Sequence, residues 1–175
     1  MNLNLAICIP ARMASTRFPE KPIALLHDKP MVKRVYDICK QSNIDTYVLT
    51  DSKRVHSLFP DGKCFYMEDY YDNGTERCAG FPALDSYDGV INVQGDMPDI
   101  STDIIKTVAN GLTISDNEIV TVFTKMHKDL QKDPNSVKLI HTESQAHWFC
   151  RAGLNYGVHH LSLIHISEPT RLLSI

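Results

Sequence analysis

The feature that most constrains this chain is a short apolar run that ends in a stiff, cationic loop. The run, Leu5–Ile9, is typical of a buried strand. The loop after it combines cations with prolines: Arg12, Arg17, Lys21, Pro10, Pro19 and Pro22. Ligands of open α/β sheets bind beyond the carboxyl ends of the strands, where Arg and Lys neutralise phosphate charge. The pattern therefore predicts a phosphate-binding loop directly after the first strand.

Strand-like and helix-like patterns alternate along the rest of the chain. Strands are expected at residues 5–10, 46–50, 64–67, 89–93, 119–123, 137–140 and 146–150. Helices are expected at residues 31–41, 75–84, and from 101 or 103 to 110. A further short helix is expected to begin after Asp51, which would cap it, and to run to about residue 58. Such alternation predicts the α/β class, with a mostly parallel sheet and helices on both of its faces.

The common glycine-rich nucleotide motifs are absent from this sequence. It contains neither G-x-x-x-x-G-K-[ST] nor a G-x-G-x-x-G after the first strand. Phosphate would then be held by cationic side chains and backbone amides of the first loop. A P-loop kinase and a dinucleotide-dependent dehydrogenase are both disfavoured.

Charge, cysteine content and apolar runs indicate the partners and the compartment to expect. The net charge of -3 offers no general polyanion-binding surface, so nucleic acid is not expected as a partner. The five cysteines show no C-x-x-C spacing, which favours a reducing cytosol over a disulfide framework or a zinc site. No apolar run reaches membrane-spanning length. We therefore expect a cytoplasmic protein without a membrane partner.

A second informative stretch is Ile91–Pro98, where an apolar strand runs into Gln94, Gly95 and Asp96. A carboxylate at the end of a strand, beside a glycine that permits close approach, suits Mg²⁺ bound to nucleotide phosphates. The alternative is an ordinary turn in which Asp96 caps the next element.

A third stretch, Asn73–Arg77, places Gly74 and Thr75 at the start of a helix. Amides at a helix N-terminus favour an anion or another acceptor. Taken alone, the pattern is equally typical of Thr75 as a helix cap and Arg77 as a solvated surface charge.

In this order, the three stretches resemble the sugar-acid cytidylyltransferases, and most closely the 3-deoxy-manno-octulosonate (KDO) cytidylyltransferases. That family reads I-P-A-R-x-x-S-T-R-F-P-G-K-P, S-G-T-[DE]-R and V-Q-G-D-x-P at the corresponding places. Glu20 stands where the family has glycine, and it adds a negative charge beside the expected phosphate site. Weaker similarities to the family occur at residues 50–55, 133–138, 148–152 and 157–160.

The resemblance implies a Rossmann-like nucleotidyltransferase fold and transfer of CMP from CTP to the anomeric hydroxyl of KDO. Pyrophosphate would leave, and the product would serve lipopolysaccharide synthesis. It implies Mg²⁺ as cofactor and a homodimer. Nucleotide-binding residues by resemblance are Pro10, Ala11, Arg12, Arg17, Lys21, Gly74, Thr75 and Arg77. Arg12, Lys21 and Asp96 would be catalytic, Asp96 would hold the metal, and Gln94 and His160 would contact the sugar.

Two alternatives remain open beside this function. One is a cytidylyltransferase for another, sialic-type sugar acid, although the S-T-R-F-P of the first loop favours KDO. The other is a CTP-binding module without turnover.

The end of the chain resembles a translated sequencing-transposon adapter over Leu161–Arg171. We therefore expect a cytidylyltransferase domain over residues 1–160, incomplete at its C-terminus, and a non-native tail over residues 161–175. The family supplies a second metal-binding aspartate from sequence beyond that point, so the chain as it stands would turn over slowly or not at all.

Overall fold

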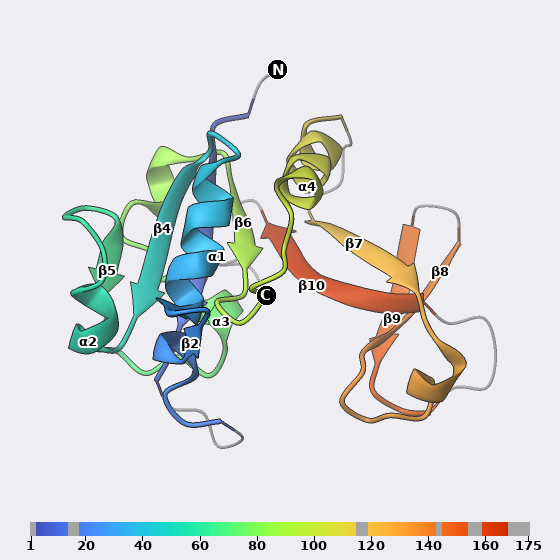
Figure 1. The fold of residues 1–175 in the computed structure, drawn as a ribbon. Helices are drawn as coiled ribbons and strands as arrows, with labels where there is room; N and C mark the ends of the chain where they lie inside the picture. Colours follow the sequence, from blue (N-terminus) through green and yellow to red (C-terminus); the bar gives the residue numbers. More distant parts are fainter. Residues whose placement is uncertain (1–2, 14–17, 115–118, 143–144, 154–158, 168–175) are drawn as a thin grey trace. The chain divides into compact units, whose positions relative to one another are not determined.

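The computed structural model describes residues 3–13, 18–114, 119–142, 145–153 and 159–167, the last range by its backbone alone. The chain divides into two compact units (Figure 1). The first comprises residues 1–120 and 164–175, and the second comprises residues 121–163. No helix in the described ranges combines the length and apolarity needed to cross a membrane.

The first unit is built on parallel strands in the order β5-β4-β1-β6. The strands are β1 (Leu5–Ala11), β4 (Asp45–Thr50), β5 (Cys64–Tyr66) and β6 (Gly89–Val93). The apolar run became β1, whose seven residues are all buried because it lies between β4 and β6. The last residues of β10 (His159–Ser167) pair antiparallel with β6.

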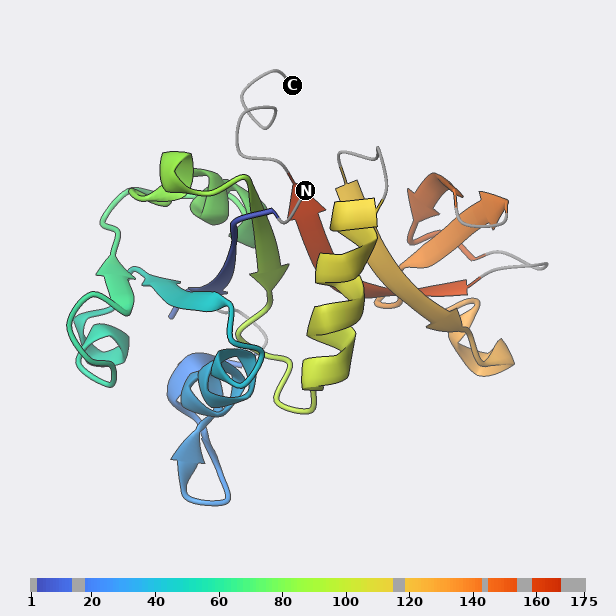
Figure 2. The ribbon, with the colours of Figure 1, turned by 90° about the horizontal axis from the view of Figure 1, so that it is seen from above.

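Helices cover both faces of this sheet, as the alternating pattern predicted. They are α1 (Met31–Lys40), α2 (Lys53–His56), α3 (Gly74–Ala79) and α4 (Thr102–Ile114). Figure 2 shows α1 and α4 on one face of the sheet and α3 on the other. The spacing of Met31, Val35 and Cys39 gives α1 one buried stripe. The predicted α/β class is confirmed.

Two local predictions were wrong, and one element was not anticipated. Ser52, not Asp51, caps α2, since its side chain accepts from the amide of Val55. Helix α3 ends at Ala79 and does not reach Leu84. A hairpin of β2 (Leu25–Leu26) and β3 (Lys29–Pro30) was not anticipated, because its turn uses left-handed His27 and Asp28 without a glycine.

The second unit is an antiparallel element that the alternating pattern did not foresee. It contains most of β7 (Ile119–Lys125), then β8 (Lys138–Thr142) and β9 (Gln145–Cys150). Strands β8 and β9 pair antiparallel, and the first residues of β10 pair with β8. Lys138 is fully buried, and its ammonium donates to the carbonyl oxygens of Asp133 and Arg151.

The cysteines give a simple test of the packing. Cys8, Cys39, Cys64 and Cys78 are buried, and Cys150 is partly exposed. Burial raises the pKa of Cys39 and of Cys64 to about 12, and a hydrogen bond with Cys78 together with burial raises the pKa of Cys8. Titration of the native protein at pH 8 with an aromatic disulfide reagent should therefore show one fast thiol, and the other four only after denaturation. Two or more fast thiols would contradict this packing.

Candidate active site

Three segments far apart in sequence meet at the carboxyl end of the first unit's sheet. They are the loop after β1, the start of α3 and the loop after β6. Together they enclose a pocket of about 250 Å³. Its lining residues are Pro10, Arg12, Tyr71, Asp72, Asn73, Gly74, Arg77 and Gln94. Five residues expected from the sequence (Pro10, Arg12, Gly74, Arg77 and Gln94) therefore share one pocket.

Two glycines allow these segments to approach so closely. A Cβ on Gly74 would lie 2.9 Å from the ring Cγ of Pro10 and 3.3 Å from both terminal atoms of the Gln94 amide. A Cβ on Gly95 would lie 3.1 Å from the carbonyl oxygen of Pro10. Any larger residue at either position must displace a neighbour, so both glycines are explained by contact distance.

The start of α3 is held by reciprocal capping. The Asn73 side chain accepts from the amide of Glu76 at 3.0 Å, and the Glu76 carboxylate accepts from the amide of Asp72 at 2.9 Å. The alternative in which Thr75 caps the helix is therefore wrong. The capping fixes Asp72, Asn73 and Gly74 as one wall of the pocket.

Gln94 is oriented by a chain of side-chain hydrogen bonds. Its amide nitrogen donates to Asn92 at 2.8 Å, and the Asn92 amide nitrogen donates to the Thr75 hydroxyl at 3.4 Å. Asn92 is only 3% exposed and was missed in the sequence, where it reads as an ordinary strand residue. Thr75 does not line the pocket but supports Gln94 through Asn92.

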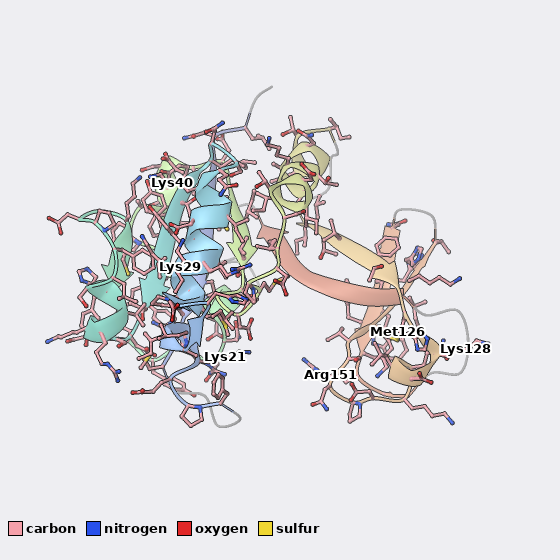
Figure 3. The ribbon with its side chains drawn as sticks, viewed as in Figure 1. Lys21, Lys29, Lys40, Met126, Lys128 and Arg151 are labelled. Carbon is pink, nitrogen blue, oxygen red and sulfur yellow. The ribbon has the colours of Figure 1, made fainter. Side chains whose placement is uncertain are left out.

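Asp96 and Lys21 form an ion pair beside this pocket. The Lys21 Nζ donates to an Asp96 carboxylate oxygen at 2.6 Å, with the side chains 34% and 47% exposed. Lys21, labelled in Figure 3, begins the 3-10 helix η1 (Lys21–Ile23). This hydrogen bond joins the loop after β6 to the first loop, so Lys21 and Asp96 lie side by side.

Asp96 can hold a magnesium ion if phosphate oxygens and waters supply the other ligands. The described part of the chain holds no group of three or more His, Cys, Asp or Glu side chains that could bind a metal. Mg²⁺ does not need one, because one or two carboxylates with phosphate oxygens and waters suffice. The Asp96 carboxylate already faces a cation, the Lys21 ammonium, so its position suits a positive charge.

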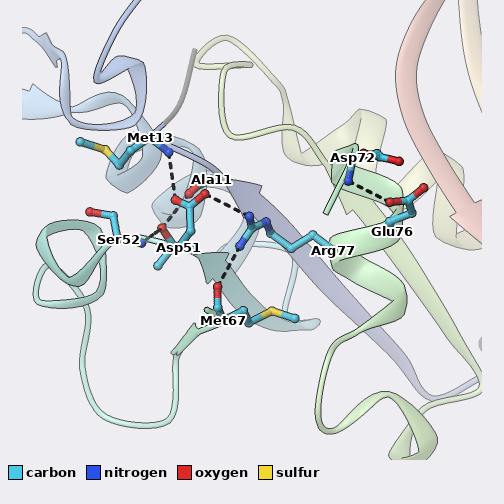
Figure 4. A network of polar contacts seen from close by, with 9 residues as sticks. Ala11, Met13, Asp51, Ser52, Met67, Asp72, Glu76 and Arg77 are labelled. Atoms are coloured by element: carbon cyan, nitrogen blue, oxygen red, sulfur yellow. Dashed lines mark hydrogen bonds and ion pairs between the residues drawn. The ribbon is translucent and has the colours of Figure 1, made fainter. Parts of the chain in front are cut away.

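Arg77 is a buried residue of the pocket wall, which makes the solvated-surface alternative wrong. Its side chain is 4% exposed and pairs with Asp51 at 3.1 Å (Figure 4). The guanidinium also approaches the carbonyl oxygen of Met67 at 3.5 Å and lies 5.0 Å from the ring centre of Tyr71. Tyr71 was missed in the sequence because it lies in a stretch that reads only as polar loop.

The predicted residues not yet described are Ala11, Arg17 and His160. Arg12 is exposed at the pocket, and Ala11 is buried with its carbonyl accepting from the Thr50 hydroxyl at 2.7 Å. Arg17 lies outside the described residues. His160 is described by its backbone alone, which pairs with Lys138 in the second unit.

Glu20 keeps the left-handed backbone for which glycine is suited. Its φ is 56° and its ψ 23°, and its carboxylate pairs with Arg54. Glu20→Gly and Glu20→Ala both remove the ion pair, but only Glu20→Gly relieves the left-handed conformation. The free energy of unfolding of Glu20→Gly should exceed that of Glu20→Ala by about 1 kcal/mol in denaturant titrations. Equal stabilities would show that the loop does not hold this conformation in solution.

Comparisons with known proteins agree with this geometry. The sequence profile of the cytidylyltransferase family matches residues 6–172. A 3-deoxy-manno-octulosonate cytidylyltransferase of Francisella tularensis subsp. novicida is 32% identical over 98% of this chain and 73% of its own length. The enzyme of the same name from Aeromonas salmonicida is 37% identical over 86% of this chain and 62% of its own length. The chain spans 62–66% of the length of six such relatives, which include the Aeromonas enzyme.

Solved structures show the same similarity. A CMP:2-keto-3-deoxy-manno-octonic acid synthetase complexed with CTP superposes with a TM-score of 0.86 at 26% identity, over 97% of this chain and 76% of that protein. A 4-diphosphocytidyl-2C-methyl-D-erythritol synthase from Anaerococcus prevotii shares the fold, with a TM-score of 0.58 at 17% identity over 95% of this chain and 71% of that one. The chain belongs to the cytidylyltransferase family, and within it to the 3-deoxy-manno-octulosonate cytidylyltransferases.

Proposed function

We propose that this protein transfers CMP from CTP to KDO and releases pyrophosphate. The observation that carries the proposal is the shared pocket. The cationic loop after β1, the start of α3 and the loop after β6 converge there in a chain of this family. A phosphate chain laid along the first loop would meet Arg12 and Lys21, with Asp96 next to Lys21.

The chemistry that we propose is an in-line displacement at phosphorus. The anomeric hydroxyl of KDO loses its proton to solvent, and its oxygen forms a bond to the α-phosphorus of CTP. The bond from that phosphorus to the bridging oxygen of the β-phosphate breaks, and pyrophosphate carries away the electron pair. Arg12 and Lys21 would bind and orient the phosphates, and Gln94 would orient the sugar acid. Arg17 and His160 are proposed for the same roles of phosphate and sugar binding.

Magnesium belongs to this proposal through Asp96. Bound there, Mg²⁺ would supply charge neutralisation on the phosphates. In the structure without ligand, the Asp96 carboxylate pairs with the Lys21 ammonium, so the two residues that would hold the metal and a phosphate lie side by side. The setting that we propose is the cytoplasm, with the product used for lipopolysaccharide and a homodimer as the working form.

The test is CTP- and Mg²⁺-dependent pyrophosphate release with KDO. UTP serves as the control for the base, and a sialic-type sugar acid serves as the control for the acceptor. Release that requires both CTP and KDO supports the proposal. Release only with the other sugar acid would reassign the substrate, and no release with any acceptor by the folded protein would overturn catalysis by this chain.

A CTP-binding module without turnover is the second candidate. It is favoured by one observation, that Glu20 places a carboxylate in the first loop, where the family has glycine. Equilibrium dialysis with CTP separates the two functions, because the module would bind CTP and release no pyrophosphate.

A further inference from the structure

We propose that Asp51 is a positioning residue for nucleotide binding, which holds two walls of the pocket at a fixed spacing without contacting the ligand. This inference rests on the proposed function for the identity of the nucleotide. Its structural part concerns the protein without ligand and is tested separately.

The Asp51 carboxylate bridges two segments with its two oxygens (Figure 4). One oxygen accepts from the backbone amide of Met13 in the first loop at 3.1 Å. The other accepts from the guanidinium of Arg77 on α3, also at 3.1 Å. Arg12, next to Met13, and Arg77 both line the pocket, whereas Asp51 does not. Asp51 therefore lies behind the pocket and joins its two cationic walls.

Hydrogen bonds at the end of β4 fix the position of the Asp51 backbone. Ala11 and Thr50 are partners in the parallel register of β1 and β4. The Thr50 hydroxyl donates to the Ala11 carbonyl at 2.7 Å and accepts from the amide of Ser52 at 3.2 Å. The residue between Thr50 and Ser52 is thus held on both sides, at the place where β1 passes into the loop.

Arg77 depends on this contact for its charge balance. It is 4% exposed, and the other acceptor described for its guanidinium is the Met67 carbonyl, at 3.5 Å. A buried cation that loses its carboxylate is strongly destabilised and moves toward other acceptors or solvent. Because Arg77 also packs on the Tyr71 ring, such movement would alter the pocket wall. CTP binding would then have to fix the arrangement of the pocket wall, which Asp51 holds before the ligand binds, and the affinity for CTP would fall.

The first experiment uses the ligand-free protein and does not depend on the reaction. Hydrogen exchange of the Met13 amide is compared in the wild type and in Asp51→Ala. We expect the variant to exchange at least about tenfold faster at Met13, because its acceptor is gone. Unchanged exchange at Met13 would overturn the bridge, whatever the protein's activity.

The second experiment measures CTP binding and kinetics in Asp51→Asn. This variant keeps an acceptor oxygen but loses the charge that faces Arg77. We expect the Kd and the KM for CTP to rise about tenfold, with the KM for KDO changed less than about twofold. In an Arg77→Met background, the further effect of Asp51→Asn on CTP should fall below about twofold, because the positioning acts through Arg77. Full additivity, or equal effects on both substrates, would overturn the proposal.

Asp45→Asn is the matched control on the same strand. Asp45 begins β4 at its opposite end, accepts from the Tyr87 hydroxyl at 3.0 Å and pairs with Lys63 at 3.9 Å. The Asp45→Asn variant is expected to change the unfolding midpoint without changing the KM for CTP. If both variants weakened CTP binding alike, general destabilisation would explain the result and the proposal would fail. Dialysis against CTP keeps the test separate from turnover, so an inactive protein that binds CTP still decides it.

Discussion

Asp96→Asn is expected to lower kcat by about 100-fold or more while the protein stays folded. The substitution keeps the size of the side chain and removes the charge that faces Lys21 at 2.6 Å. Removal of one preorganised group that stabilises transition-state charge costs about 10²–10³ in kcat where it has been measured at oxyanion holes, and we expect a similar loss here. Steady-state pyrophosphate release with CTP, Mg²⁺ and KDO measures the effect. CTP affinity without metal should not weaken by more than about threefold, because the carboxylate does not itself bind the phosphates.

Asp99→Asn provides the control for this charge change. Asp99 is exposed, lies three residues further along the same loop and does not line the pocket. We expect its kcat to stay within about twofold of the wild type. A kcat for Asp96→Asn within about fivefold of the wild type would remove Asp96 from the proposed machinery.

The second large effect is expected from Gly74→Ala. The added Cβ would lie 2.9 Å from the Pro10 ring and 3.3 Å from the Gln94 amide, so the first loop and Gln94 must both give way. We expect the KM for CTP to rise about tenfold or more, equivalent to about 1.4 kcal/mol of lost binding. Overpacking of this kind also lowers the free energy of unfolding by about 1–3 kcal/mol. Kinetics and denaturant titration together measure the two effects.

Gly62→Ala is the control that separates a steric effect on the pocket from a general loss of stability. Gly62 has a φ of 73°, and a Cβ there would meet no atom within 4 Å. The strain of a left-handed alanine should cost about 1 kcal/mol of stability without changing the KM for CTP. If Gly74→Ala behaved in the same way, the close approach at the pocket would not matter for binding.

The sequence predicted the elements whose signals are local. Strand β1 follows from an unbroken apolar run, α1 from its apolar spacing, and β6 from the apolar residues Val90, Ile91 and Val93 before Gln94. The convergence of Arg12, Gly74 and Gln94 was also predictable. Segments that follow parallel strands end at the same edge of a sheet, so residues in those loops come together.

The supporting contacts behind the pocket were not predictable from the sequence. Asp51 was expected to cap α2, because a polar residue before a helix is the usual local signal. In the structure, Ser52 meets that need, and Asp51 bonds to Met13 and Arg77, 38 and 26 residues away in sequence. Arg77 was expected either at the nucleotide or in solvent, because the sequence does not show that Tyr71 and Met67 enclose it.

The sequence by itself therefore determined the α/β class of the first unit, the order of its strands along the chain and the motifs whose residues line the pocket. Only the tertiary structure decided the antiparallel pairing of β8 with β9 and the bridge from Asp51 to two pocket walls. The physical reason is the separation in sequence over which each interaction acts. Apolar periodicity and glycine positions act within a few residues, whereas the choice of a partner for a buried charge depends on which distant segments the folded sheet brings within 3–4 Å.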